Sequence, residues 1–216
     1  MLGKTHRITG LAAYTGLLTQ ATRPVHTFNQ SNVILKTLDS YVTTPVLDFL
    51  HLTQLRGSHV TGASIAQFMM MAMLYGVILY YGLVLPDVDS KNSTLGRYVP
   101  FIEDTVGHRT IFHSIFVVIA LGLISFMTSG LLQVVFALLT AAYYFHLVED
   151  AYSLQGINWI VFPIKRRWAK YRYQVDGVFE HVVFYIAWMA TLVNIGILLY
   201  ASSALKMIPE LFNFTN

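Results

Sequence analysis

The chain has no cysteine, which excludes disulfide bonds and thiolate metal sites. Charged residues are also scarce: they make up 12% of the 216 residues, whereas a soluble domain has about a quarter. Hydrophobic residues make up 55%, and the mean hydropathy is +0.56. These proportions indicate a membrane protein. The net charge is only +3, and such charges set membrane topology more often than they bind nucleic acid, so we expect no nucleic-acid partner.

Internal repeats and low-complexity segments are absent too, and we expect one integral membrane domain over residues 1–216. The first 23 residues combine an early positive charge with a short apolar stretch, as signal peptides do, but they show no convincing cleavage site. Residues 23–63 are polar and lack a lasting periodicity. We interpret them as an extramembrane insertion with one short helix over 46–55.

Long apolar segments account for most of the remaining chain. A spanning helix needs about 20 apolar residues. A weaker segment, 9–20, is rich in Ala, Gly and Thr and could span the membrane, lie in its interface or pack as a small-residue helix. The sequence therefore predicts an all-α polytopic membrane bundle of four to five transmembrane helices. The four clear spans are 65–85, 112–127, 131–145 and 182–205, with a tight turn at 128–130 between the second and third.

Basic residues predict the orientation of these spans. The densest positive cluster follows segment 131–145, and such clusters face the cytoplasm. The turn at 128–130 is then outside and the loop 86–111 is cytoplasmic, as is the N-terminus if segment 9–20 spans. We therefore expect a protein of the bacterial inner membrane. The cluster comprises Lys165, Arg166, Arg167, Lys170 and Arg172.

Six ionisable residues fall at the same, cytoplasmic ends of the predicted spans. Each has an ordinary explanation alone, such as a helix end in water or a surface histidine. As a set they need another explanation, because ionisable groups at membrane depth are costly and usually functional. They are predicted to bind metal, and they are His6, Asp87, Asp89, His113, His146 and Asp150.

The spacing of these residues suits metal binding. His146 and Asp150 are four apart, so on a helix they share one face. Pro86 disfavours a continuing helix, and in an extended stretch Asp87 and Asp89 would point to the same side. Imidazoles with carboxylates suit zinc, manganese or iron, while magnesium would favour oxygen ligands alone. The set is large enough for one or two divalent ions.

Three blocks of sequence resemble a known family. The chain is similar to the membrane-bound, metal-dependent hydrolases of bacterial inner membranes that are described as LexA-regulated or LexA-binding. The resemblance covers residues 6–16 and 74–165, and it implies that the early His6 belongs to the mature protein. The blocks are LPDVDSKNSTLGR, GHRTIFHS and HLVEDAYSLQGINWIVFPI.

The chain departs from the family's pattern at three positions, none of which removes an expected ligand. Ser90 stands where a histidine often follows the second Asp, and Phe112 where a threonine often precedes the second histidine. Glu149 stands beside Asp150 where a small residue is usual. The family's substrate is poorly defined, so the resemblance implies hydrolysis without naming what is hydrolysed.

We therefore predict metal-assisted hydrolysis of a phosphoester, such as a phospholipid or an isoprenoid phosphate, at the membrane surface. Water with a pKa lowered by the ion would be the nucleophile, and Asp89 or Asp150 could accept its proton. Arg109, with Arg97 as a second candidate, could clamp a phosphate. His108 fits a leaving-group acid or an exposed loop histidine equally well.

Two other classes of protein explain the same residues. A divalent-metal transporter or sensor would use them as a transit or regulatory site, although transporters place such sites near the bilayer midplane. A non-enzymatic membrane scaffold would use them to hold a structural metal. The sequence predicts neither the oligomeric state nor the identity of the ion.

Overall fold

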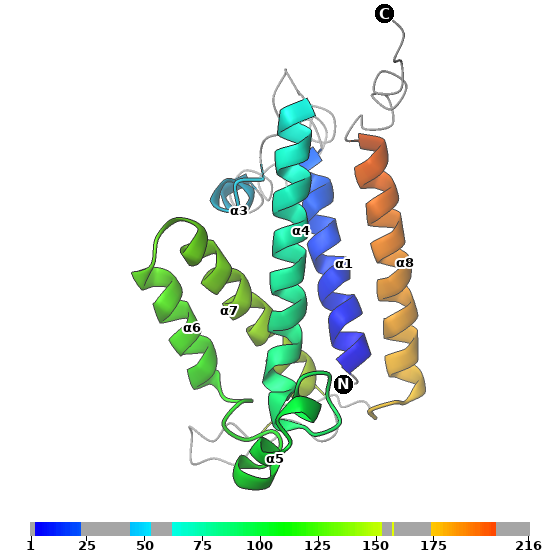
Figure 1. The fold of residues 1–216 in the computed structure, drawn as a ribbon. Coiled ribbons are helices and arrows are strands. Elements are labelled where there is room, and N and C mark those ends of the chain that lie inside the picture. Colours follow the sequence, from blue (N-terminus) through cyan, green and yellow to red (C-terminus); the bar gives the residue numbers. More distant parts are fainter. Residues whose placement is uncertain (1–2, 23–43, 53–61, 153–156, 158–173, 202–216) are drawn as a thin grey trace, which may run out of the picture. The chain divides into compact units, whose positions relative to one another are not determined.

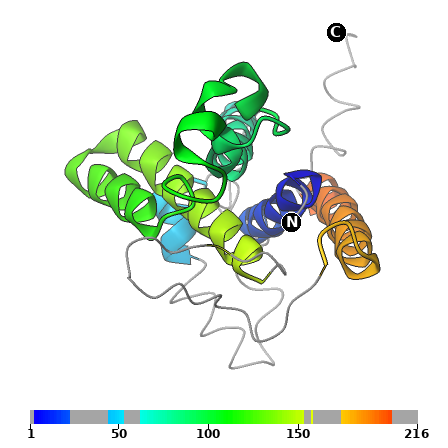
Figure 2. The ribbon, with the colours of Figure 1, turned by 90° about the horizontal axis from the view of Figure 1, so that it is seen from below.

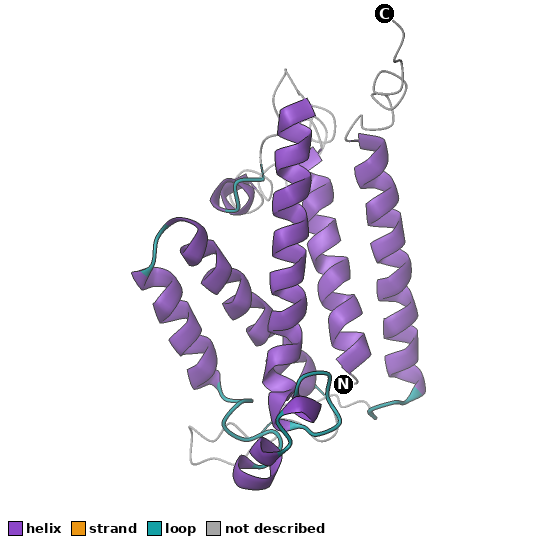
Figure 3. Ribbon diagram, viewed as in Figure 1, coloured by secondary structure: helices purple, strands orange, loops and turns teal. Residues whose placement is uncertain are grey.

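A computed structural model describes residues 3–22, 44–52, 62–152, 157 and 174–201. Every regular element in these ranges is a helix (Figure 3). The basic cluster 165–172 and most of segment 23–63 lie outside the described residues. The predicted all-α class is therefore confirmed for the part of the chain that the structure describes.

Among the described residues, three helices are long and apolar enough to cross a membrane. They are α4 (Gly62–Val84), α7 (Gly130–Ala151) and α8 (Val178–Ala201). α6 (Ile115–Met127) is also apolar but has only 13 residues, or about 20 Å of helix. It begins three residues later than predicted because Ser114 caps it: the hydroxyl accepts a hydrogen bond from the Phe116 N–H at 3.2 Å.

The chain forms two compact units, one of residues 1–11 and 75–188 and the other of residues 12–74 and 189–216. Helices α1 (Gly3–Thr22), α4 and α8 contribute residues to both units. In the second unit, the Tyr14 hydroxyl donates to the Ala72 carbonyl at 2.6 Å, and the Asn194 amide donates to the Ala12 carbonyl at 3.2 Å. Hydrogen bonds thus link α1 to α4 and to α8 in this unit.

The helix predicted over 46–55 is present in the second unit but is shorter and begins earlier. It is α3 (Thr44–Phe49), and a turn follows in which His51 has a φ of 53°. Leu47 and Leu52 are fully buried on either side of this turn. The left-handed backbone at His51 ends the helix before the predicted boundary.

In the first unit, α6 and α7 form an antiparallel hairpin (Figures 1 and 2). The predicted turn at 128–130 is confirmed, since α6 ends at Met127 and α7 begins at Gly130 with a φ of 61°. Near the turn, the Ser125 hydroxyl donates to the Gln133 carbonyl at 2.9 Å. At the other end, Val118 of α6 shares a buried cluster with Tyr143 and Leu147 of α7.

Helices α4 and α7 approach each other closely at Gly82. A Cβ atom at this position would lie 2.8 Å from the Cβ of Ala142, closer than such atoms come in proteins. The absence of a side chain at Gly82 therefore permits the crossing. One residue later, the Leu83 carbonyl accepts a hydrogen bond at 2.7 Å from Nδ1 of His146, which lies one turn after Ala142.

After α4 the chain tightens into a short 3₁₀ helix, η2 (Leu85–Asp89), with Pro86 in its first turn. The extended conformation predicted for this stretch was wrong. A further 3₁₀ turn, η3 (Gly96–Tyr98), and α5 (Phe101–Val106) follow. A side chain at Gly96 would collide with the Ser90 carbonyl, so this glycine allows the loop after η2 to fold back against η2.

Candidate metal centre

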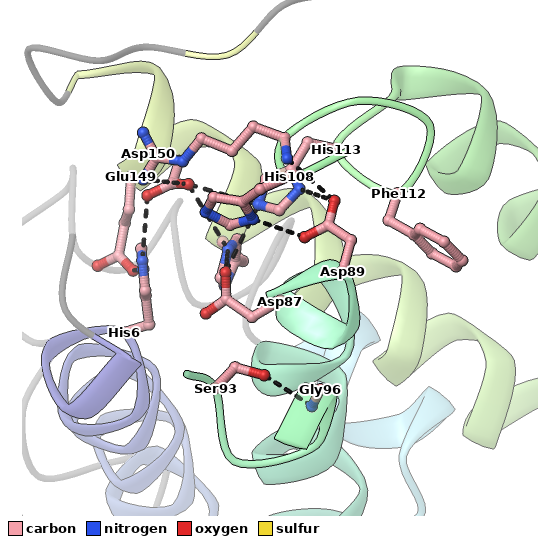
Figure 4. A network of polar contacts seen from close by, with 12 residues as sticks. His6, Asp87, Asp89, Ser93, Gly96, His108, Phe112, His113, Glu149 and Asp150 are labelled. Atoms are coloured by element: carbon pink, nitrogen blue, oxygen red, sulfur yellow. Dashed lines mark hydrogen bonds and ion pairs between the residues drawn. The ribbon is translucent and has the colours of Figure 1, made fainter. Parts of the chain in front are cut away.

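Side chains from four parts of the first unit meet in one cluster (Figure 4). α1 contributes His6, and η2 contributes Asp87 and Asp89. His113 comes from the loop residue just before the Ser114 cap of α6, and α7 contributes His146 and Asp150. Five of these six residues are no more than 1% exposed, the exception being Asp87. The structure therefore brings together all six residues that were predicted to bind metal.

Four possible ligand atoms of this cluster lie close together. His113 Nε2 lies 3.6 Å from Asp87 Oδ1 and 3.5 Å from Asp150 Oδ2. His146 Nε2 lies 3.6 and 3.9 Å from the same two oxygens, and all four atoms are within 4.8 Å of one another. Ligands about 2.1 Å from a tetrahedral ion are about 3.4 Å apart. The observed separations are close to this value, so small movements would let these atoms hold one divalent ion.

Each histidine of the cluster is held by its other ring nitrogen. Nδ1 of His113 lies 3.2 Å from Asp89 Oδ2, Nδ1 of His146 is 2.7 Å from the Leu83 carbonyl, and Nδ1 of His6 is 2.5 Å from Glu149 Oε2. None of the three Nε2 atoms has a hydrogen-bond partner within the described residues. Ligand histidines in metalloproteins are typically oriented in this way, by an acceptor on the nitrogen remote from the ion.

His6 lies at one side of the four-atom group. Its ring stacks on that of His146 with the centroids 4.0 Å apart, and its Nε2 is 3.2 Å from Asp150 Oδ1. The two oxygens of Asp150 therefore face different partners, with Oδ1 toward His6 and Oδ2 toward His113 and His146. Both oxygens of Asp150 thus face imidazole nitrogens and would be available to a divalent cation.

Asp89 lies on the opposite side of His113 from Asp87. Its Oδ1 is 2.7 Å from Nδ1 of His108, while its Oδ2 accepts the Arg109 backbone N–H at 3.0 Å and contacts His113. The two aspartates diverge because residues two apart in a 3₁₀ helix lie on different faces. In this arrangement Asp89 contacts Nδ1 of His113, the ring nitrogen remote from Asp87. Asp89, His108 and His113 also form a second group close enough to hold an ion.

The two arginines predicted to bind phosphate lie in different surroundings. The Arg109 guanidinium is largely buried, with Nη2 2.8 Å from Asp150 Oδ2, and its backbone has a positive φ of 58°. Arg97 is exposed; its guanidinium lies over the Tyr98 ring, and its Nε donates to the Thr94 carbonyl at 3.2 Å. Of these two arginines, Arg109 is the one that contacts the histidine–carboxylate cluster within the described residues.

Carboxylates dominate the electrostatics around His113. Burial lowers the pKa of this imidazole, but contacts with Asp150, Asp87 and Asp89 outweigh burial and raise its pKa to about 10. These three negative charges stabilise a positive charge at the ring. A divalent ion would meet the same field, and it would compete with the proton for Nε2.

A family comparison agrees with the membrane character of the chain. The model of the YdjM inner membrane protein family matches residues 1–209. The chain belongs to this family. No curated protein and no solved structure matches it. The family description names the inner membrane and no activity, so it supports the predicted location and leaves the predicted hydrolysis untested.

Two groups that contact the histidines of this YdjM family member were not predicted. In the sequence, Glu149 stands out only as a departure from the family's pattern. Its place beside Asp150 is the signal that could have linked it to the metal centre. The Leu83 carbonyl could not be found from the sequence because a backbone group carries no residue-specific signal. Of the other departures, Phe112 points away from the cluster (Figure 4).

Proposed function

We propose that this YdjM family member is a membrane-embedded, metal-dependent hydrolase. One observation carries the proposal: three buried imidazoles are each held at Nδ1, and their Nε2 atoms lie near two aspartates. Asp87, His113, His146 and Asp150 would hold a first ion, and His6 with Asp150 could help to hold a second. The mixture of nitrogen and oxygen ligands favours zinc or manganese over magnesium.

The residues around the ligands fit a hydrolytic reaction. A divalent ion bound here would lower the pKa of water and stabilise charge on a phosphoryl oxygen. Asp150 could take the proton from an attacking water. His108 could protonate the leaving group, since its side chain is 35% exposed and its Nδ1 is already paired with Asp89. Its other nitrogen is then the one to face substrate.

Arg109 fits the binding of a phosphate group. Its guanidinium lies beside Asp150, so a substrate phosphate at the ion would come within its reach. Its positive φ is uncommon for a residue with a side chain, and strained backbone of this kind concentrates at functional sites. We therefore assign Arg109 the phosphate-binding role. Arg97 is the weaker candidate.

The substrate class follows from where the cluster lies in the chain. η2 directly follows a helix that is apolar enough to span a membrane, and His146 and Asp150 end another. A site at the ends of spanning helices is at the level of lipid headgroups. We therefore propose a phospholipid or isoprenoid phosphate as substrate, reached from the cytoplasmic side as the basic residues 165–172 predict.

The test is lipid phosphoester turnover by protein purified into lipid nanodiscs, with manganese or zinc added. We expect His146→Ala and Asp87→Ala to abolish turnover and to lower the bound metal measured by elemental analysis. His181→Ala and Asp104→Ala are matched controls, because both residues lie outside the cluster and their side chains are 44% and 66% exposed. Equal turnover by the wild type and the two cluster variants would contradict the proposal. Metal uptake by proteoliposomes without turnover would favour a transporter.

A further inference from the structure

We propose that Glu149 is a positioning residue that, with Thr9, sets the orientation of the His6 ring at the metal centre. The inference rests on the proposed function, in which His6 belongs to that centre. Glu149 Oε2 lies 2.5 Å from His6 Nδ1, and Glu149 Oε1 accepts the Thr9 hydroxyl hydrogen bond, also at 2.5 Å. One carboxylate of α7 therefore binds two side chains of α1.

The spacing of the two partners explains how a single carboxylate reaches both. His6 and Thr9 are three residues apart on α1, so their side chains lie on the same face. Each oxygen of Glu149 accepts one hydrogen bond from that face. A carboxylate that is only 12% exposed needs such partners, because burying an unpaired charge is costly. The hydrogen bond from Thr9 therefore helps to hold the Glu149 carboxylate in position to accept from His6 Nδ1.

The orientation of the ring follows from this contact. With Nδ1 directed to Glu149, the opposite nitrogen, Nε2, is 3.2 Å from Asp150 Oδ1. A ring flipped by 180° about the Cβ–Cγ bond would put Cδ2 in the place of Nδ1 and Cε1 in the place of Nε2, so that carbon atoms would face Glu149 and Asp150. The stacking of His6 on His146 restricts the ring plane but does not distinguish the two orientations. The hydrogen bond from Nδ1 to Glu149 does.

Other contacts hold this part of α1 in place without Glu149. Gly10 leaves no room for a side chain against Leu83, and Arg7 donates to the Thr94 hydroxyl at 2.8 Å. Loss of Glu149 should therefore leave the helix in position while freeing the ring. The expected consequence is weaker metal binding, by the 10–100-fold that is typical when a ligand histidine loses its acceptor.

The experiment is cobalt(II) titration of the purified protein, followed by its visible absorption. We expect Glu149→Ala to weaken binding about 10–100-fold, with partial rescue in Glu149→Gln, whose amide oxygen can still accept from Nδ1. In a His6→Ala background, Glu149→Ala should have no further effect, because Glu149 acts through His6. Arg7→Gln removes a different α1 contact and is the matched control, with unchanged affinity expected.

Two results would overturn the inference: wild-type affinity in Glu149→Ala, or the same loss in both backgrounds. If the wild type binds no cobalt, the proposed function fails and the inference is decided by nitrogen NMR of the His6 ring. At a pH where the ring is neutral, we expect the proton on Nδ1 in the wild type and a mixture of tautomers in Glu149→Ala. An unchanged tautomer would overturn the positioning role independently of metal.

Discussion

The two ends of α7 differ in which side chains they bury: apolar side chains are exposed at its start, and polar side chains are buried near its end. At its start, Leu131 and Leu132 are 53% and 58% exposed, whereas near its end His146 and Asp150 are at most 1% exposed. Apolar exposure is harmless where the surroundings are lipid, but buried polar groups are expensive in any protein and need partners. The start of α7 is thus an apolar, exposed end, whereas its other end is a polar end that is held by specific contacts.

The largest effect is expected from Asp150→Asn at the polar end. This carboxylate contacts His6, His113, His146 and Arg109, so the change removes a ligand and the negative charge beside a largely buried guanidinium. We expect metal binding to fall by more than the roughly 100-fold that loss of a histidine's acceptor costs. Elemental analysis measures the loss of bound metal. A thermal melt measures the effect on stability of removing the charge beside the Arg109 guanidinium. Leu132→Ala, at the opposite end of α7, is the control and should retain metal.

Asp89→Asn tests whether Asp89 binds the ion or orients a ligand. Its oxygens contact His108, His113 and the Arg109 N–H. If it orients His113, affinity falls about 10–100-fold while the number of ions bound at saturation is unchanged. Isothermal titration with zinc measures both quantities. A lower number of bound ions would show instead that Asp89 is a ligand.

Sequence reasoning found the residues of the polar end more readily than their roles. The spacing of His146 and Asp150 predicts a shared helix face, and both residues do face the cluster. Asp87 and Asp89 were expected to point the same way, but η2 is a 3₁₀ helix and they contact opposite sides of His113. The sequence has no local periodicity that reveals this 3₁₀ helix. The close approach of Gly96 to the Ser90 carbonyl that accompanies it is a tertiary contact.

Packing between α4 and α7 supports the polar end through Gly82. We expect Gly82→Ala to destabilise the protein by about 1–3 kcal/mol, because the added methyl group would overlap the Ala142 side chain. It should also weaken metal binding, since the displaced Leu83 carbonyl would no longer hold His146. Denaturant unfolding and zinc titration measure these effects. Combining it with Ala142→Gly should restore both properties, and failure of this rescue would count against close packing as the cause.

The smallest effect is expected at the start of α7, in Gly130→Ala. Gly130 has a φ of 61°, and a side chain in this left-handed conformation costs about 1–2 kcal/mol. Nothing lies within 4 Å of the position that a Cβ atom would take, so the cost is conformational rather than steric crowding by neighbours. Gly130→Asn should cost less, because asparagine tolerates this backbone better. Denaturant unfolding ranks the variants, and zinc affinity should be unchanged in both. A loss of affinity here would mean that the two ends of α7 are coupled, and that the contrast between them does not reflect independent roles.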